Sequence, residues 1–156
     1  MASIELNPKI RDYVNIVYPI LDSRKEETLI KDCPICTCGT VKDPAICINP
    51  ESTRIKRMDN KMKAFVVAHE QAHLKYRECV ADEACAAIKS KNFLRVPEKE
   101  FEGLLVKWFV EYRPDAIQMS SNKRTLRRFL EILRKHTNNL PRYLAKEVES
   151  AYNSLK

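Results

Sequence analysis

Apolar residues recur at helical spacing along most of this chain, and each run follows a residue type that commonly begins a helix. The first predicted helix covers residues 8–22, with a bend at Pro19. The predicted starts of the helices are, in chain order, Asn7–Pro8, Asp59 or Asn60, Pro97, Ser120 or Ser121, and Pro141. The helices after Pro97 and after Ser120 or Ser121 have expected apolar faces of Phe101, Leu104, Leu105, Trp108 and Phe109, and of Leu126, Phe129, Leu130 and Leu133. The last helix carries Tyr143, Leu144, Val148, Tyr152 and Leu155.

The pattern changes between Cys33 and Pro50. Gly39, Asp43–Pro44 and the short apolar run 45–48 predict two short strands with a turn between them. With helices elsewhere, the expected fold class is mainly α (α+β), with a small β-hairpin or edge strand before the helix that begins at Asp59 or Asn60 and runs through residues 64–73. At 156 residues the chain fits a single domain over 1–156, with the C-terminal helices spanning 97–156.

Residues 1–5 lack the basic and then apolar order of a signal sequence, and no run of about 18 apolar residues could span a bilayer. We therefore expect a cytoplasmic protein without a membrane partner, or a virus or phage product released without a signal peptide.

The chain has six cysteines, four of them close together at Cys33, Cys36, Cys38 and Cys47. In a reducing compartment we expect free thiols, buried as small apolar groups, or metal ligands. The Cys33–Cys36 spacing suggests a second metal site, although the gap from Cys38 to Cys47 is irregular for one.

The most informative motif is His69-Glu70-Gln71-Ala72-His73, an HExxH within a predicted helix. Residues four apart lie one turn apart on the same helical face, so both imidazoles can reach one metal ion. Glu70 can then take a proton from a water at that ion. The motif predicts a Zn²⁺ site with Glu70 as general base.

A complete site needs a third ligand, and the nearby acids are Glu78, Asp82 and Glu83. On an unbroken helix Glu78 would lie about 140° around from His73, and Glu83 roughly 15 Å further along the axis. The chain must therefore turn within residues 74–80 for any of them to reach the metal.

His69–His73 followed by Glu78-Cys79-Val80-Ala81-Asp82 resembles the HExxH…ExxAD pattern of gluzincin-type zinc metallopeptidases. The resemblance covers roughly residues 45–90 and implies a zincin-like fold. It also implies roles for four positions: zinc ligands at His69, His73 and Glu78, and Asp82 as the residue that orients a ligating histidine. Residues 45–50 resemble the edge strand that pairs with an extended substrate in such enzymes.

The spacing from His73 to Glu78 is short for this family, so Glu83, or Asp82 itself, is an alternative third ligand. Cys79 stands where metzincins carry their third histidine and is a further, weaker alternative. Tyr76, Tyr112 and Arg113 could stabilise an oxyanion, but the sequence does not place them.

The predicted function is a zinc-dependent metallopeptidase acting on a protein or peptide substrate. The alternative is a non-catalytic zincin-like binding protein that contacts nucleic acid through basic C-terminal helices. The formal net charge of +7 and a basic cluster support that alternative. The cluster comprises Lys123, Arg124, Arg127, Arg128, Arg134, Lys135, Arg142 and Lys146. His136, near a predicted helix end, is expected to be structural.

Overall fold

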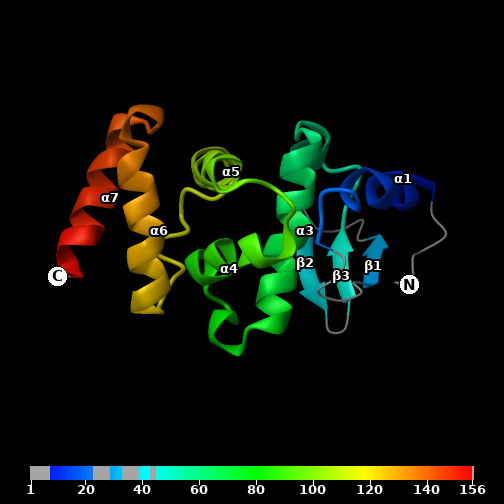
Figure 1. The fold of residues 1–156 in the computed structure, drawn as a ribbon, viewed down its shortest axis with the longest axis horizontal. Helices are drawn as coiled ribbons and strands as arrows, with labels where there is room; N and C mark the ends of the chain where they lie inside the picture. Colours follow the sequence, from blue (N-terminus) through cyan, green and yellow to red (C-terminus); the bar gives the residue numbers. More distant parts are fainter. Residues whose placement is uncertain (1–7, 23–28, 33–38, 43–44, 156) are drawn as a thin grey trace.

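A computed structural model describes residues 8–22, 29–32, 39–42 and 45–155, and it is mainly helical with one small sheet (Figure 1). The expected mainly α class is therefore confirmed. The elements are α1 (Pro8–Val17), β1 (Leu29–Asp32), β2 (Gly39–Lys42), β3 (Ala45–Ile48), α2 (Thr53–Lys56), α3 (Asn60–Lys75), η1 (Arg77–Cys79), α4 (Glu83–Lys89), η2 (Ser90–Phe93), α5 (Glu98–Glu111), α6 (Lys123–Lys135), η3 (Thr137–Asn139) and α7 (Arg142–Ser154).

The sheet has three strands in the order β1-β3-β2. The predicted hairpin is present: β2 pairs antiparallel with β3, with Gly39 opposite Ile48, while β1 pairs parallel with β3. The expectation that residues 45–50 form an edge strand is wrong, because β3 has a partner on both sides. The strand next to α3 is instead β2, whose second edge faces that helix (Figure 1).

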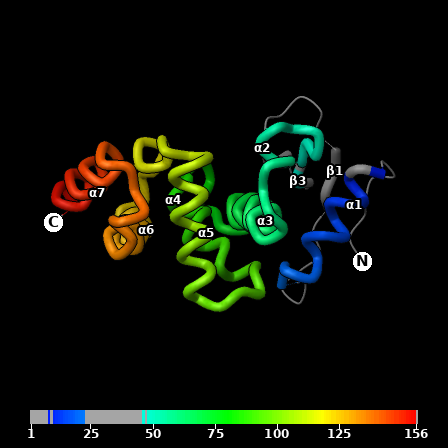
Figure 2. Tube along the Cα trace, turned by 90° about the horizontal axis from the view of Figure 1, so that it is seen from above, coloured from blue at the N-terminus to red at the C-terminus, as the bar shows by residue number. Residues whose placement is uncertain are grey.

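Helix α3 is the centre of the molecule, between the sheet and α1 on one side and α4 and α5 on the other (Figure 2). Asp59 caps its first turn by accepting a hydrogen bond from the amide of Met62 at 2.8 Å. Most of its side chains are buried, including Phe65 and Val67. A helix surrounded in this way holds its polar side chains in fixed positions, which is what a site requires.

Two expected boundaries are wrong for local reasons. α1 ends at Val17 instead of bending at Pro19, because the residue before a proline disfavours helical backbone. α6 is capped by Asn122, whose side chain accepts from the amide of Thr125, and not by Ser120 or Ser121. Ser120 instead accepts a hydrogen bond from the amide of Ala84 at 2.9 Å, and the amide of Ser121 donates to Asp82.

The predicted inward faces of α5 and α6 are buried throughout. In α7 only Leu144 and Val148 are buried, whereas Tyr143 is 66% exposed. The α6–α7 pair forms the end of the molecule farthest from the sheet (Figure 1). Among the residues that the structure describes, no helix has both the length and the apolar character needed to cross a bilayer.

Candidate metal site

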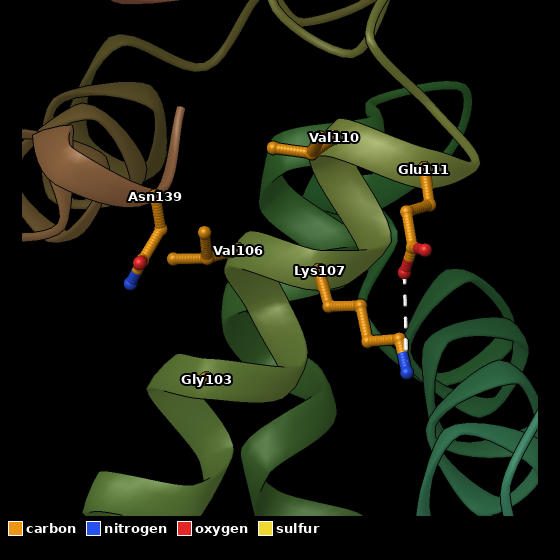
Figure 3. A pocket seen from close by; sticks show the side chains of 6 residues that line it. All are labelled: Gly103, Val106, Lys107, Val110, Glu111 and Asn139. Carbon is orange, nitrogen blue, oxygen red and sulfur yellow. Dashed lines mark ion pairs between the residues drawn. The ribbon is translucent and has the colours of Figure 1, made fainter. Parts of the chain in front are cut away.

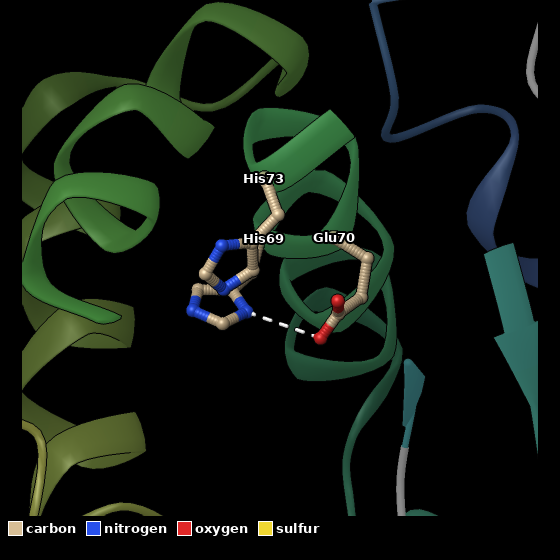
Figure 4. A group of neighbouring side chains, drawn as sticks. All are labelled: His69, Glu70 and His73. Atoms are coloured by element: carbon tan, nitrogen blue, oxygen red, sulfur yellow. Dashed lines mark hydrogen bonds and ion pairs between the residues drawn. The ribbon is translucent and has the colours of Figure 1, made fainter. Parts of the chain in front are cut away.

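His69 and His73 face the same side of α3, one turn apart, with ring centroids separated by 4.7 Å (Figure 4). Glu70 lies beside them, and one ligand atom from each of the three residues falls within 4.8 Å of the others. The Glu70 carboxylate approaches Nδ1 of His69 at 3.3 Å. The helical spacing of the motif therefore brings together the residues predicted from it.

Glu83, at the start of α4, completes the cluster. Its Oε2 atom lies 2.9 Å from Nε2 of His69 and 3.4 Å from Nε2 of His73. The side chain is only 14% exposed. We refer to His69, His73 and Glu83, the residues that could hold a metal ion, as the metal site, with Glu70 adjacent to it.

The chain makes the turn that the sequence requires. Helix α3 ends at Lys75, Tyr76 and Val80 are extended, and η1 lies between them. Ala81 then takes left-handed backbone, with φ of 58°, and α4 begins at Glu83. This reversal carries Glu83 back to histidines that it could not reach along a continuous helix.

Glu78, the third ligand that the family resemblance implies, is exposed on η1, and none of its contacts connects it to the histidines. The turn that brings Glu83 inward leaves Glu78 at its outer surface. Of the three acids considered from the sequence, Glu83 is the one that approaches both histidines.

Asp82 is fully buried but does not contact a histidine, so its expected orienting role is not what the geometry shows. One carboxylate oxygen accepts from the amide of Cys85 at 2.9 Å, which caps α4. The other accepts from the amides of Ser121 and Asn122, at 2.9 and 2.7 Å. Asp82 thus joins the start of α4 to the start of α6.

The histidine rings are oriented by other groups. His73 Nδ1 lies 2.8 Å from the carbonyl oxygen of Cys79, so this nitrogen carries the proton. The lone pair of Nε2, which lies 3.4 Å from Glu83, can then bind a metal. The His69 ring packs against the ring of Trp108, with centroids 5.0 Å apart, and against Phe65 at 6.4 Å. Trp108 is buried, as the sequence predicts.

Arg113, which follows α5, holds the outer oxygen of Glu83. Its Nη1 donates to Oε1 of Glu83 at 3.1 Å, and its Nε donates to Asp115 at 2.9 Å. The other carboxylate oxygen of Glu83 is left to face the histidines. Because Arg113 is engaged in these bonds, we do not assign it the oxyanion role considered from the sequence.

The charged groups of the site shift the pKa values of His69 and Glu83 in opposite directions. Burial opposes protonation of His69, but the neighbouring carboxylates of Glu70 and Glu83 outweigh it and raise the pKa of His69 to about 9. Burial would likewise raise the pKa of Glu83, but its contacts with both histidines and the charge of Arg113 lower it well below its ordinary range. The cluster stabilises positive charge between its carboxylates.

These residues fit a divalent cation. Nε2 of His69 is buried and lies 2.9 Å from Glu83. It nevertheless forms no hydrogen bond with Glu83 or with any other described residue. A buried polar atom without such a bond is costly and calls for a ligand. Two imidazole nitrogens and one carboxylate oxygen form the three-ligand set of many catalytic zinc sites, which leave one position open.

The six cysteines were expected to be free thiols or metal ligands, and the structure tests this for only some of them. Cys79 and Cys85 form a disulfide, so they are neither free thiols nor metal ligands. Cys33, Cys36 and Cys38 lie outside the described residues, and Cys47 falls within β3. A second metal site at those four positions stays a prediction.

The basic residues of α6 are largely matched by acids or carbonyls. Arg134 pairs with Glu149 at 2.8 Å and Lys135 with Glu102 at 3.1 Å. Arg128 lies 3.6 Å from Glu98, and Arg127 donates to a carbonyl of α7's C-terminal end. These contacts weaken the case for a phosphate-binding face. His136 pairs with Glu102 at 3.2 Å at the end of α6, in keeping with a structural role.

A pocket separate from the metal site is lined by residues of α5 and by Asn139 of η3, which lies opposite Val106 (Figure 3). It is lined by Gly103, Val106, Lys107, Val110, Glu111 and Asn139. Gly103 opens it, since a Cβ placed there would meet no atom within 4 Å. None of the lining residues belongs to the metal site.

Comparison with models of known protein families, with curated protein sequences and with solved structures gives no match for this chain. Inference about function therefore rests on the residues and their geometry.

Proposed function

We propose that this protein is a zinc-dependent metallopeptidase of the gluzincin type, with His69, His73 and Glu83 as zinc ligands and Glu70 as general base. The observation that carries the proposal is the approach of one Glu83 oxygen to Nε2 of both histidines, at 2.9 and 3.4 Å. Nitrogen and carboxylate ligands in this number suit Zn²⁺ with an open coordination position.

The chemistry divides between the metal and Glu70. Zn²⁺ bound at this site would polarise the carbonyl of a peptide bond and lower the pKa of a coordinated water. Glu70, 12% exposed and beside His69, accepts the proton of the attacking water. Its carboxyl group then delivers that proton to the amine nitrogen that leaves.

We further propose that an extended peptide substrate pairs with the edge of β2 that faces α3. In the part of the chain described, β2 pairs with β3 alone, so its other edge retains backbone donors and acceptors. Addition of a strand to such an edge is a common mode of peptide recognition. This role moves to β2 from residues 45–50, to which the sequence had assigned it.

The cytoplasmic location expected from the sequence stays a prediction, and we do not include it in the proposal. The Cys79–Cys85 disulfide favours an oxidising compartment instead, because reducing conditions in the cytosol keep most thiols free.

The test replaces Glu70 by Gln, which keeps the size of the side chain and removes its ability to take a proton. The variant should retain zinc and fold, while cleavage of an unfolded protein substrate falls by about 10²–10⁴-fold. Zinc content is measured by elemental analysis and cleavage by peptide mass mapping.

Glu78→Gln provides the matched control, because it makes the same change at an exposed acid of the neighbouring segment and should leave cleavage intact. A wild type that binds zinc yet cleaves nothing across a broad peptide library would favour the non-catalytic alternative. Absence of zinc from the wild type would refute the metal site itself.

A further inference from the structure

A disulfide between Cys79 and Cys85 closes the segment that links α3 to α4. Cys79 is the last residue of η1, and Cys85 lies in the first turn of α4. Both residues are fully buried. The bond therefore fixes the two ends of the reversal that brings α4 back to α3.

The closed segment carries two groups that belong to the metal site. The carbonyl oxygen of Cys79 accepts the hydrogen bond of His73 Nδ1 at 2.8 Å, which sets the orientation of that ring. Glu83 lies within the same segment and supplies the oxygen nearest both histidines. One ligand and the orienting partner of a second ligand are thus tied to the same bond.

The backbone inside the segment does not hold this shape by its own preference. Ala81 has φ of 58°, a left-handed conformation that a residue with a Cβ adopts only when its surroundings impose it. Val80, beside it, is 66% exposed and contributes little packing. The disulfide and the buried cap of Asp82 restrain this turn, together with backbone hydrogen bonds from Asp82 to Cys79 and from Glu83 to Met119.

We propose that Cys79 and Cys85 are positioning residues of the metal site, whose disulfide holds Glu83 and His73 in the geometry that binds the metal. Metal affinity then depends on the oxidation state of this bond. The inference rests on the metal site of the proposed function but does not depend on peptidase activity.

The test compares zinc affinity of the whole chain before and after reduction by a water-soluble phosphine. The phosphine gives two electrons to the disulfide and takes the oxygen of a water molecule, and the two sulfurs leave as thiols with that water's protons. Unlike a dithiol, the phosphine oxide formed offers no thiolate to compete for zinc. Affinity is measured by competition with a chromophoric chelator.

We expect reduction to weaken zinc binding by about 10–100-fold, the usual cost of losing a group that orients a ligand. Near-ultraviolet circular dichroism establishes that the reduced chain is folded at the temperature used. Cobalt substitution provides a second readout, because coordination by a released thiolate would add a strong charge-transfer absorption. Appearance of that absorption would overturn the proposal in favour of a ligand role for Cys79.

The matched control is Cys79→Ala/Cys85→Ala, which leaves the other four cysteines in place. Its affinity should equal that of the reduced wild type and should not respond to the phosphine. Cys79→Ala alone, which also prevents the bond, serves if the double variant does not fold. A response that persists in these variants would assign the effect to other cysteines and overturn the proposal.

Two further outcomes separate this proposal from the proposed function. Equal affinity in the oxidised and reduced wild type overturns the positioning role and leaves the metallopeptidase proposal intact. No zinc binding in either state overturns both.

Discussion

Glu83 and His69 lie on different helices, yet Oε2 of the first approaches Nε2 of the second to 2.9 Å. Glu78, although closer in sequence, is exposed and does not join them. The turn between α3 and α4 is responsible, because it points one acid inward and the other toward solvent.

The first prediction follows from this contrast. Glu83→Gln should weaken zinc binding by more than about 100-fold, since it alters the proposed third ligand directly and loss of an orienting group alone costs about 10–100-fold. Glu78→Gln should leave the affinity unchanged. Chelator competition measures both, and a loss in the Glu78 variant equal to that in the Glu83 variant would restore the original family assignment.

The part of the site that the sequence predicted is the part on one helix. His69, Glu70 and His73 share a regular element, and helical periodicity alone fixes their relative positions. The need for a turn within residues 74–80 also follows from helix geometry and is confirmed. Its form was not predictable, because neither glycine nor proline ends α3.

The remaining groups depend on contacts between distant parts of the chain. Arg113 reaches Glu83 only after α5 has packed against α3. The six-residue separation of Cys79 and Cys85 gave no signal for a disulfide, because their proximity is created by the turn itself. The sequence did not predict that α4 starts at Glu83. With that start known, the position of Asp82 directly before it would have identified Asp82 as the helix cap.

In the fold, too, the features set by local sequence were predicted and those set by distant contacts were not. The periodic faces of α5 and α6 are buried as predicted, because burial of an apolar stripe decides helix packing. The pairing order of the strands was not predicted: β1 joins β3 in parallel, a contact that no turn signal reports.

The second prediction concerns Asp82. Asp82→Ala should lower the free energy of unfolding by about 3 kcal/mol, because it removes a cap and two further part-buried hydrogen bonds, from the amides of Ser121 and Asn122. Asp59→Ala, which removes a cap with one such bond, should cost about 1 kcal/mol. Urea unfolding of the metal-free chains measures both values, and equal losses would contradict the bridging role of Asp82.

The third prediction is a pH dependence at Glu102, far in sequence from the metal site. Burial would raise the pKa of Glu102, but hydrogen bonds from Lys135 and His136 outweigh it and lower the pKa from 4.5. A carboxyl whose pKa is lower in the folded state stabilises the fold above its unfolded pKa and loses that contribution as the pH falls through its folded pKa.

The difference in unfolding free energy between the wild type and Glu102→Gln should therefore shrink as the pH falls below 4.5. Subtracting the variant removes the contribution of other acids, including Glu83. Chemical unfolding across this range provides the measurement, and a difference independent of pH would contradict the ion-pair assignment.

The last prediction tests Arg113 as a positioning residue. Arg113 binds Oε1 of Glu83 at 3.1 Å while two of its nitrogens hold Asp115, at 2.9 and 3.3 Å. Arg113 has two opposing effects on metal binding. Its positive charge repels a metal ion, but its hydrogen bond fixes the carboxylate of Glu83. Orientation should dominate, because Asp115 and Glu83 together neutralise the guanidinium. Arg113→Gln should therefore weaken zinc binding by about 10–100-fold.

Arg113→Lys should recover part of this loss, since it can donate to Glu83 but cannot keep the two-pronged contact with Asp115. The matched control is Arg134→Gln, which breaks an ion pair with Glu149 on the exposed face of α6 and should change neither affinity nor spectrum. In the cobalt-substituted protein, Arg113→Gln should alter the visible absorption, because a freed Glu83 can coordinate through both oxygens. An unchanged affinity and spectrum would show that the bond to Arg113 stabilises the fold without positioning Glu83.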